Sequence, residues 1–171
     1  MQIRSATTSD AEGIASVHVA SWRSFYRDLL PAELIEARSL DLRRRQWATS
    51  LQSPERVTLV ACDDDGTIVG FASALLLEQP DNGFESYLQT LYFTPEAAGR
   101  GTGSRLLRAT ATDLLARGVV NMALRVVRLN PARGFYERLG ARLVPEGIDT
   151  DAGVFDDVVY AFDDLHTLAR A

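Results

Sequence analysis

The 171 residues, of which 46% are hydrophobic, suffice for one compact domain and are too few for two of ordinary size. The formal net charge of -5 argues against a duplex nucleic-acid binder, because phosphate contacts need clustered cationic side chains. There is no signal-peptide-like start, the longest apolar run, Ala74–Leu77, is too short to span a bilayer, and the single cysteine excludes an intrachain disulfide. We expect one cytoplasmic domain over residues 1–171, with no membrane or nucleic-acid partner and no recognisable metal cluster.

One strand and two helical regions are expected in the first third of the chain: residues 3–6, from residue 10 into the twenties, and from Pro31 to Ser53. The first helix is preceded by capping-box spacing, in which Ser9 and Glu12 would each satisfy a free backbone amide. In the second region, the run Arg43–Arg45 is most simply a solvated helix face.

Three strands are expected next, over residues 57–61, 67–72 and 84–93. The first two flank the turn Asp63–Gly66 and form a hairpin. A polar gap over residues 79–83 is expected to separate this hairpin from the third strand. Within the third strand, alternation places Glu85, Tyr87 and Gln89 on one face.

A glycine-rich turn follows the third strand and leads directly into a helix. Gly99, Gly101 and Gly103 tolerate positive φ and let a backbone approach an anion, while the unpaired amides and dipole of the helix start attract negative charge. Arg100 or Arg105 could add a charge-assisted contact. On this feature alone, a tight strand-to-helix connection and an anion site are equally good interpretations.

The turn lacks residues that two known nucleotide-binding motifs require, and this narrows the choice of anion. A nucleotide-triphosphate loop ends in Gly-Lys-Ser/Thr, whereas Gly103 is followed here by Ser104 and Arg105. A dinucleotide fold needs a third glycine and an acidic residue where this chain has Leu106 and Arg125. The sequence therefore disfavours both a nucleotide triphosphate and a dinucleotide as the bound anion.

The last third of the chain predicts a helix that ends at Gly118, a strand over 119–127, a short helix from Pro131 to Leu139, and closing strands over 141–144 and 154–162.

Two segments of the chain resemble signatures of the GNAT acetyltransferase superfamily. Leu91–Glu96 followed by Gly99–Leu107 is similar to its acetyl-CoA-binding pattern, Gln/Arg-x-x-Gly-x-Gly/Ala, and Leu124–Ala141 carries the Asn, Ala, Phe-Tyr-Glu and Gly of a second signature at matching spacing. The resemblance covers nearly the whole chain. It implies an α+β, three-layer fold, with a mixed, mostly antiparallel sheet of about seven strands, splayed between its fourth and fifth strands and flanked by helices.

The resemblance implies acetyl-CoA as the acetyl donor, and the single cysteine and two histidines predict no metal. The residues that it assigns to this co-substrate are the strand Leu91, Tyr92 and Phe93, the turn Ala98, Gly99, Arg100, Gly101, Thr102, Gly103 and Ser104, and the side chains of Asn130 and Tyr136. The family prefers Gln or Arg where this chain has Ala98. Because backbone amides do most of the phosphate binding, we expect weaker binding rather than none.

By the same resemblance Tyr136 is the general acid that protonates the departing thiolate. The family often has a glutamate at the position of Tyr87, so the base is left to Glu85, directly or through a water held by Gln89; the alternative for Glu85 is a solvated carboxylate beside a turn. The acceptor pocket is assigned to four residues: Trp22, Tyr26, Tyr87 and Gln89. An aromatic stripe such as the one formed by His18, Trp22 and Tyr26 is, however, more often part of a helix core.

Together these features predict an acetyl-CoA-dependent N-acetyltransferase that acts on a primary amine of a small molecule, a peptide or a protein N-terminus, by direct attack in a ternary complex. A catalytically silent acetyl-CoA sensor or interaction module of the same fold is the alternative, and a nucleotide-binding regulatory domain is a third reading. The acceptor amine is the expected partner, and homodimerisation is left open.

Overall fold

The computed structural model describes residues 1–25, 33, 39–145 and 156–170. Its centre is a seven-stranded sheet in the order β1-β2-β3-β4-β5-β7-β6. The strands are β1 (Gln2–Ser5), β2 (Arg56–Cys62), β3 (Ile68–Asp81), β4 (Phe84–Phe93), β5 (Met122–Val127), β6 (Arg142–Leu143) and β7 (Asp157–Phe162). The helices are η1 (Thr8–Asp10), α1 (Ala11–Phe25), α3 (Leu40–Ser50), η2 (Pro95–Ala97), α4 (Thr102–Ala116), α5 (Arg133–Arg138) and α6 (Leu165–Arg170).

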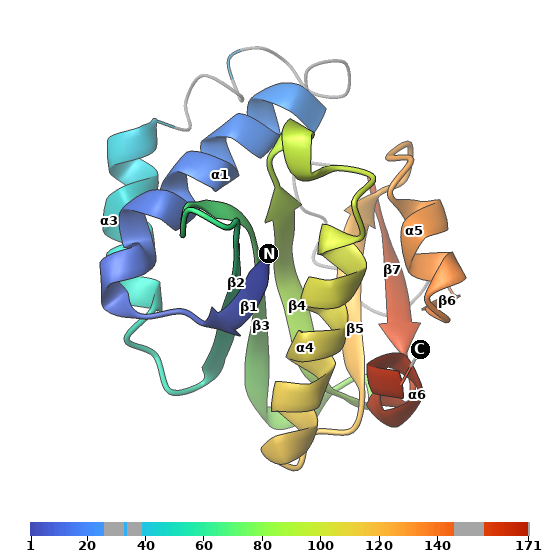
Figure 1. Cartoon of the computed structure of the whole chain (residues 1–171). Helices are drawn as coiled ribbons and strands as arrows, with labels where there is room; N and C mark the ends of the chain where they lie inside the picture. Colours follow the sequence, from blue (N-terminus) through green and yellow to red (C-terminus); the bar gives the residue numbers. More distant parts are fainter. Residues whose placement is uncertain (26–32, 34–38, 146–155, 171) are drawn as a thin grey trace.

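Helices cover both faces of the sheet and make three layers (Figure 1). On one face, α4 buries Leu106, Leu107, Ala111 and Leu114 completely, because helical spacing places these four side chains toward the sheet. On the other face, α1 and α3 pack against β2 and β3 around Phe71. This is the predicted α+β three-layer architecture. None of the described helices has the length and apolar character needed to cross a membrane.

The sheet is antiparallel at every pairing except β4 with β5, which is parallel. That parallel pairing is confined to Tyr87 with Ala123 and Leu88 with Leu124. Beyond these two pairs β4 and β5 diverge toward the carboxyl end of each strand, as the splayed sheet predicts. The divergence leaves the second half of β4 without a neighbouring strand on its β5 side.

Two of the local predictions in polar stretches are wrong. The polar gap over 79–83 belongs to the hairpin of β3 and β4, since Asn82 and Gly83 adopt positive φ of 51° and 84°, as a two-residue hairpin turn requires. The capping box uses Thr7 and Asp10 rather than Ser9 and Glu12. In addition, α6 was not expected, although Asp164 accepts a hydrogen bond from the His166 amide at its start.

The Asp10 carboxylate fastens the first strand to the first helix. It accepts two hydrogen bonds of 2.8 Å from the Arg4 guanidinium and one of 2.7 Å from the Thr7 amide. These contacts, led by that of Arg4, lower the pKa of Asp10 to about 2, against a partly opposing effect of burial. Because the folded pKa is depressed below 3.8, the stabilisation is present above that value and lost as the pH falls toward 2.

Replacement of Asp10 by asparagine is therefore expected to lower the free energy of unfolding by about 1–2 kcal/mol at pH 7, a value discounted for the solvent exposure of Arg4. The difference from wild type should shrink as the pH is lowered from 4 toward 2. Urea denaturation across this pH range measures both effects. Equal stability of the two proteins at pH 7 contradicts this role for the carboxylate.

Candidate active site

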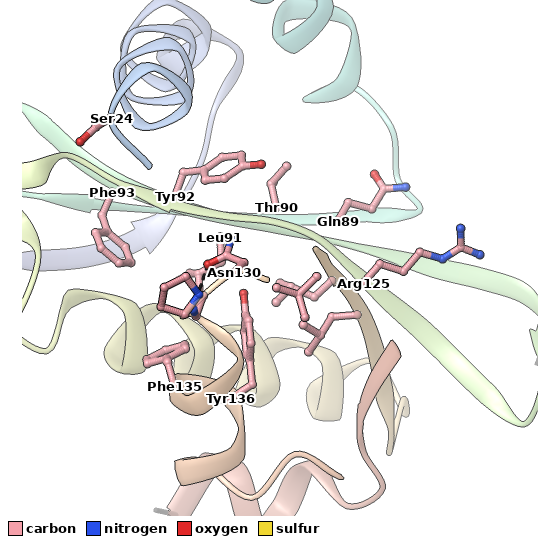
Figure 2. A pocket seen from close by; sticks show the side chains of 15 residues that line it. Ser24, Gln89, Thr90, Leu91, Tyr92, Phe93, Arg125, Asn130, Phe135 and Tyr136 are labelled. Atoms are coloured by element: carbon pink, nitrogen blue, oxygen red, sulfur yellow. Dashed lines mark hydrogen bonds between the residues drawn. The ribbon is translucent and has the colours of Figure 1, made fainter. Parts of the chain in front are cut away.

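A cleft of about 490 Å³ opens where β4 and β5 diverge, within the usual size range of small-molecule sites. Its walls come from the second half of β4, from β5, and from the segment that leads into α5 (Figure 2). The described residues that line it are Ser24, Leu88, Gln89, Thr90, Leu91, Tyr92, Phe93, Leu124, Arg125, Val126, Asn130, Pro131, Ala132, Phe135 and Tyr136. Of the site residues predicted from the sequence, Gln89, the strand 91–93, Asn130 and Tyr136 therefore line the same cleft.

A β-bulge in β4 shapes one wall of the cleft. Ser73 pairs with Thr90 while Ala74 pairs with Leu88, so Gln89 is the extra residue and has no partner on β3. Figure 2 shows Gln89, Thr90 and Tyr92 on one side of β4, whereas Asn130 and Tyr136 lie on the other. Since β5 has already diverged, the β4 backbone here presents an open strand edge, which can pair with an extended ligand.

The opposite wall is the turn that precedes α5. The Oδ1 of Asn130 accepts a hydrogen bond of 2.9 Å from the Ala132 amide, which starts the turn into the helix and fixes the side chain. This contact orients the Asn130 amide, and its Nδ2 is a donor group at the cleft wall.

Tyr136 follows on α5, is 9% exposed, and packs edge-on against Phe135 with ring centroids 5.1 Å apart. Its hydroxyl is directed toward β4 across the cleft (Figure 2).

Two contacts hold α5 against β7 and so hold Tyr136 in place. The Tyr160 hydroxyl donates to the Glu137 carboxylate, and the Arg133 Nε donates to the Tyr160 hydroxyl at 3.1 Å. Arg133 Nη1 also donates to the Arg128 carbonyl at 2.9 Å. The glutamate of the Phe-Tyr-Glu sequence is therefore a structural partner of β7.

The glycine-rich turn forms the start of α4. Gly99 and Gly101 have φ of 71° and 77°, and Gly101 is the N-cap residue of the helix. The first intrahelical bond runs from the Arg105 amide to the Gly101 carbonyl, so the amides of residues 102–104 precede the regular pattern, and no acidic side chain lies in the first turn. These features are typical of an anion site.

Gly103 differs from Gly99 and Gly101 because it does not adopt the positive φ that glycine tolerates. It is helical, and a Cβ at this position would lie 3.0 Å from Phe93 and 3.3 Å from Phe135. Gly103 therefore lets α4 pack closely against β4 and α5. Thr102 is buried and its hydroxyl donates to the Ala97 carbonyl at 3.0 Å, which closes the turn. Arg105 donates to the Met1 carbonyl at 3.2 Å, whereas Ala98 and Arg100 are exposed.

Glu85, the expected base, lies at the opposite end of β4 from the diverging strands. Its Oε2 accepts a hydrogen bond of 2.8 Å from the Val120 amide, and its own amide donates to Asn121 Oδ1. Glu85 is outside the cleft lined by the described residues. The geometry gives it a structural role at the start of β5 and does not support a role as base.

The residues predicted to form the acceptor pocket do not lie together in the structure. Trp22 is 8% exposed and donates its indole N–H to the Tyr92 hydroxyl at 3.0 Å. It therefore positions Tyr92, which lines the cleft, and does not itself line it. Tyr87 packs beside Phe84 outside the cleft, and burial together with Asp81 raises its pKa. Tyr26 lies outside the described residues.

A second cavity, of about 550 Å³, lies on the α1 and α3 side of β4 and shares Gln89 and Thr90 with the cleft. Its described lining is His18, Arg43, Gln46, Trp47, Thr49, Ser50, Arg56, Gln89 and Thr90. Arg43 is therefore not part of a uniformly solvated helix face; only Arg44 and Arg45 are, where they pair with Asp41. Arg56 was missed because a single arginine beginning a strand carries no motif.

Comparison with known proteins agrees with this geometry. The acetyltransferase (GNAT) family matches residues 18–141. The uncharacterized N-acetyltransferase YuaI of Bacillus subtilis is 30% identical over 168 residues, which is 97% of this chain and 95% of that protein. The L-2,4-diaminobutyric acid acetyltransferase of Nocardia farcinica is 32% identical over 118 residues, which is 66% of this chain and 58% of that protein.

The fold is also similar to a solved structure, the PaiA N-acetyltransferase of Thermoplasma acidophilum in complex with coenzyme A, with a TM-score of 0.76, 23% identity, and coverage of 94% of this chain and 96% of that one. The splayed sheet with helices on both faces is thus the fold of the acyl-CoA N-acyltransferases. The chain belongs to the GNAT acetyltransferase family, and it is an N-acetyltransferase.

Proposed function

We propose that the chain transfers the acetyl group of acetyl-CoA to a primary amine by direct attack within a ternary complex. One observation carries the proposal: the cleft between β4 and β5 has an open strand edge on one wall and Asn130 with Tyr136 on the other, close to the glycine-rich start of α4. The solved relative from Thermoplasma acidophilum holds coenzyme A, which supports the same donor here.

The donor fits the residues present. The amides at the start of α4, including those of Gly101 and Ser104, would bind the pyrophosphate. The edge of β4 at Leu91 would pair with the pantetheine arm as an added strand, and the Asn130 side chain would contact the same arm. The Phe93 carbonyl already accepts a hydrogen bond of 2.8 Å from the Ser21 hydroxyl, so Leu91 is the better candidate for that pairing.

In the chemical step the amine nitrogen bonds to the thioester carbonyl carbon, the carbon–sulfur bond breaks, and Tyr136 gives its proton to the departing sulfur. The amine loses a proton in the same step. Since Glu85 is bonded to Val120 and lies outside the cleft, we assign that proton to water along the polar wall formed by Gln89 and Thr90. Water reprotonates the tyrosinate once the thiol has left.

The acceptor is proposed to be a small molecule rather than a protein terminus. The relative from Nocardia farcinica is named for a small amine, L-2,4-diaminobutyric acid. The second cavity beside Gln89 also has the size of a small-molecule site.

The test is a thiol-release assay with acetyl-CoA over a panel of small amines, peptides and protein termini, run beside a calorimetric titration of acetyl-CoA. We expect binding, and turnover on small amines. Binding without turnover on any amine favours the silent sensor, and absence of binding contradicts the enzyme and the sensor alike. Protection of the fold against heat by ATP or NAD, but not by CoA, would instead favour a nucleotide-binding domain.

A further inference from the structure

The cavity on the α1 and α3 side of β4 has a strongly cationic wall. Arg43 reaches it from α3 and Arg56 from the start of β2, and no carboxylate lines it among the residues that the structure describes. The shared residues Gln89 and Thr90 place this cavity next to the cleft in which the acetyl group would be transferred. Its position therefore suits a group of the acceptor that lies beyond the reacting amine.

Arg56 is fixed in place by neutral partners. Its Nη1 donates to the Gln89 Oε1 at 2.6 Å and to the Ser73 hydroxyl at 3.1 Å. Burial lowers the pKa of its guanidinium, but arginine remains cationic in proteins. Gln89 and Ser73 bring no negative charge, so the cation of Arg56 is oriented by its neighbours without being neutralised by them.

The same wall contains polar atoms whose bonding capacity is unused. The Nε of Arg56 and the Oγ1 of Thr90 are buried and have no hydrogen-bond partner within the described part of the chain. Buried polar groups without partners cost free energy, so such groups usually mark a place that water or a ligand completes. Half-buried cations beside them favour a ligand with negative charge.

We propose that the acceptor is a small amine that also carries a carboxylate, and that Arg56 and Arg43 bind this carboxylate while the amine reaches the acetyl group past Gln89 and Thr90. A planar guanidinium matches the two oxygens of a carboxylate, and charge-assisted hydrogen bonds of this kind are about twice as strong as neutral ones. The inference rests on the proposed function and names its substrate class.

The experiment compares matched acceptors. Lysine and ornithine are each assayed against their carboxamides, which keep both amines and lose the carboxylate. For wild-type protein we expect the acids to have a KM roughly 10- to 100-fold below that of the amides. Arg56→Gln should raise the KM of the acids by a similar factor and change that of the amides much less, and Arg56→Lys should restore part of the loss.

Two further variants keep the outcome interpretable. Arg45→Gln is the matched control, because it removes one exposed cation from the same helix as Arg43 outside the cavity; both substrate classes should be unaffected. Arg43→Gln supplies a second test if Arg56→Gln fails to fold, as judged by its Tm. Equal use of acids and amides by wild type, or an equal loss on both in the variants, overturns the proposal.

Two further results separate this inference from the proposed function. If acetyl-CoA binds but no panel member is turned over, lysine is titrated calorimetrically into the CoA-bound protein: binding that Arg56→Gln abolishes supports the carboxylate site, and absence of binding overturns it. If the wild-type protein acetylates ethanolamine phosphate better than β-alanine, the carboxylate proposal is overturned and a phosphate-bearing acceptor is indicated instead. Efficient turnover of amides alone overturns the inference and leaves the proposed function intact.

Discussion

Replacement of Tyr136 by phenylalanine is expected to lower kcat by roughly 100- to 10,000-fold, the usual contribution of a positioned acid. The substitution removes only the hydroxyl that points across the cleft, and the edge-on packing against Phe135 is retained. If the hydroxyl is the proton donor, as proposed, the sulfur of the variant's substrate must leave as a free thiolate. The affinity for acetyl-CoA should remain within a few-fold of wild type, because the other contacts proposed for acetyl-CoA would come from the β4 edge, Asn130 and the start of α4.

Steady-state kinetics and a calorimetric titration of the variant measure these two quantities separately, and its Tm shows whether the fold is intact. A fall in kcat with unchanged affinity and Tm assigns the hydroxyl to the chemical step. Unchanged kcat removes Tyr136 from the mechanism. Loss of acetyl-CoA binding together with kcat would make the hydroxyl a binding group instead.

A second large effect is expected from Ser104→Glu, which places a carboxylate in the first turn of α4. In the free protein this charge should be neutral to stability or favourable by about 0.3–1 kcal/mol, because the helix start attracts anions. In the complex the same charge would repel the pyrophosphate. We therefore expect the Kd for acetyl-CoA to rise roughly 10- to 100-fold while Tm is maintained or raised.

Thr112→Glu is the matched control, since it adds the same charge to an exposed position of the same helix. It lies eight residues further along, or about 12 Å, which exceeds the screening length at physiological ionic strength. The affinity of the Thr112→Glu variant for acetyl-CoA should equal that of wild type. Equal weakening by the two substitutions would mean a general charge effect, and no weakening by Ser104→Glu would place the pyrophosphate elsewhere.

The fold was predictable from sequence because its signals are local. Buried residues at helical spacing in α4, the apolar strands and the turn glycines each determine an element within a few residues of themselves. The resemblance to the two GNAT signatures then supplied the mixed, mostly antiparallel sheet and its splay, whereas the order of the strands comes from the structure. Two local predictions were wrong. The hairpin turn at Asn82 and Gly83 lies in a polar stretch that was interpreted as a gap between strands. The capping box uses Asp10, which also contacts Arg4, instead of Glu12.

The acceptor side of the site was not predictable in this way. Alternation along β4 gave the face on which Glu85 lies, but not that its carboxylate would bond to the Val120 amide, 35 positions along the chain. The bulge at Gln89 depends on the register with β3 and leaves no mark in the sequence of β4. Arg43 and Arg56 meet at one cavity only because α3 packs over the sheet.

The most direct test of the central claim is an amide NMR titration of the protein with acetyl-CoA. The proposal predicts saturable shifts at the amides of Gly101, Ser104 and their neighbours at the start of α4, together with shifts at Leu91 on the β4 edge and at the Asn130 side chain. Absence of shifts in these segments, or saturable shifts confined to another part of the molecule, would contradict it.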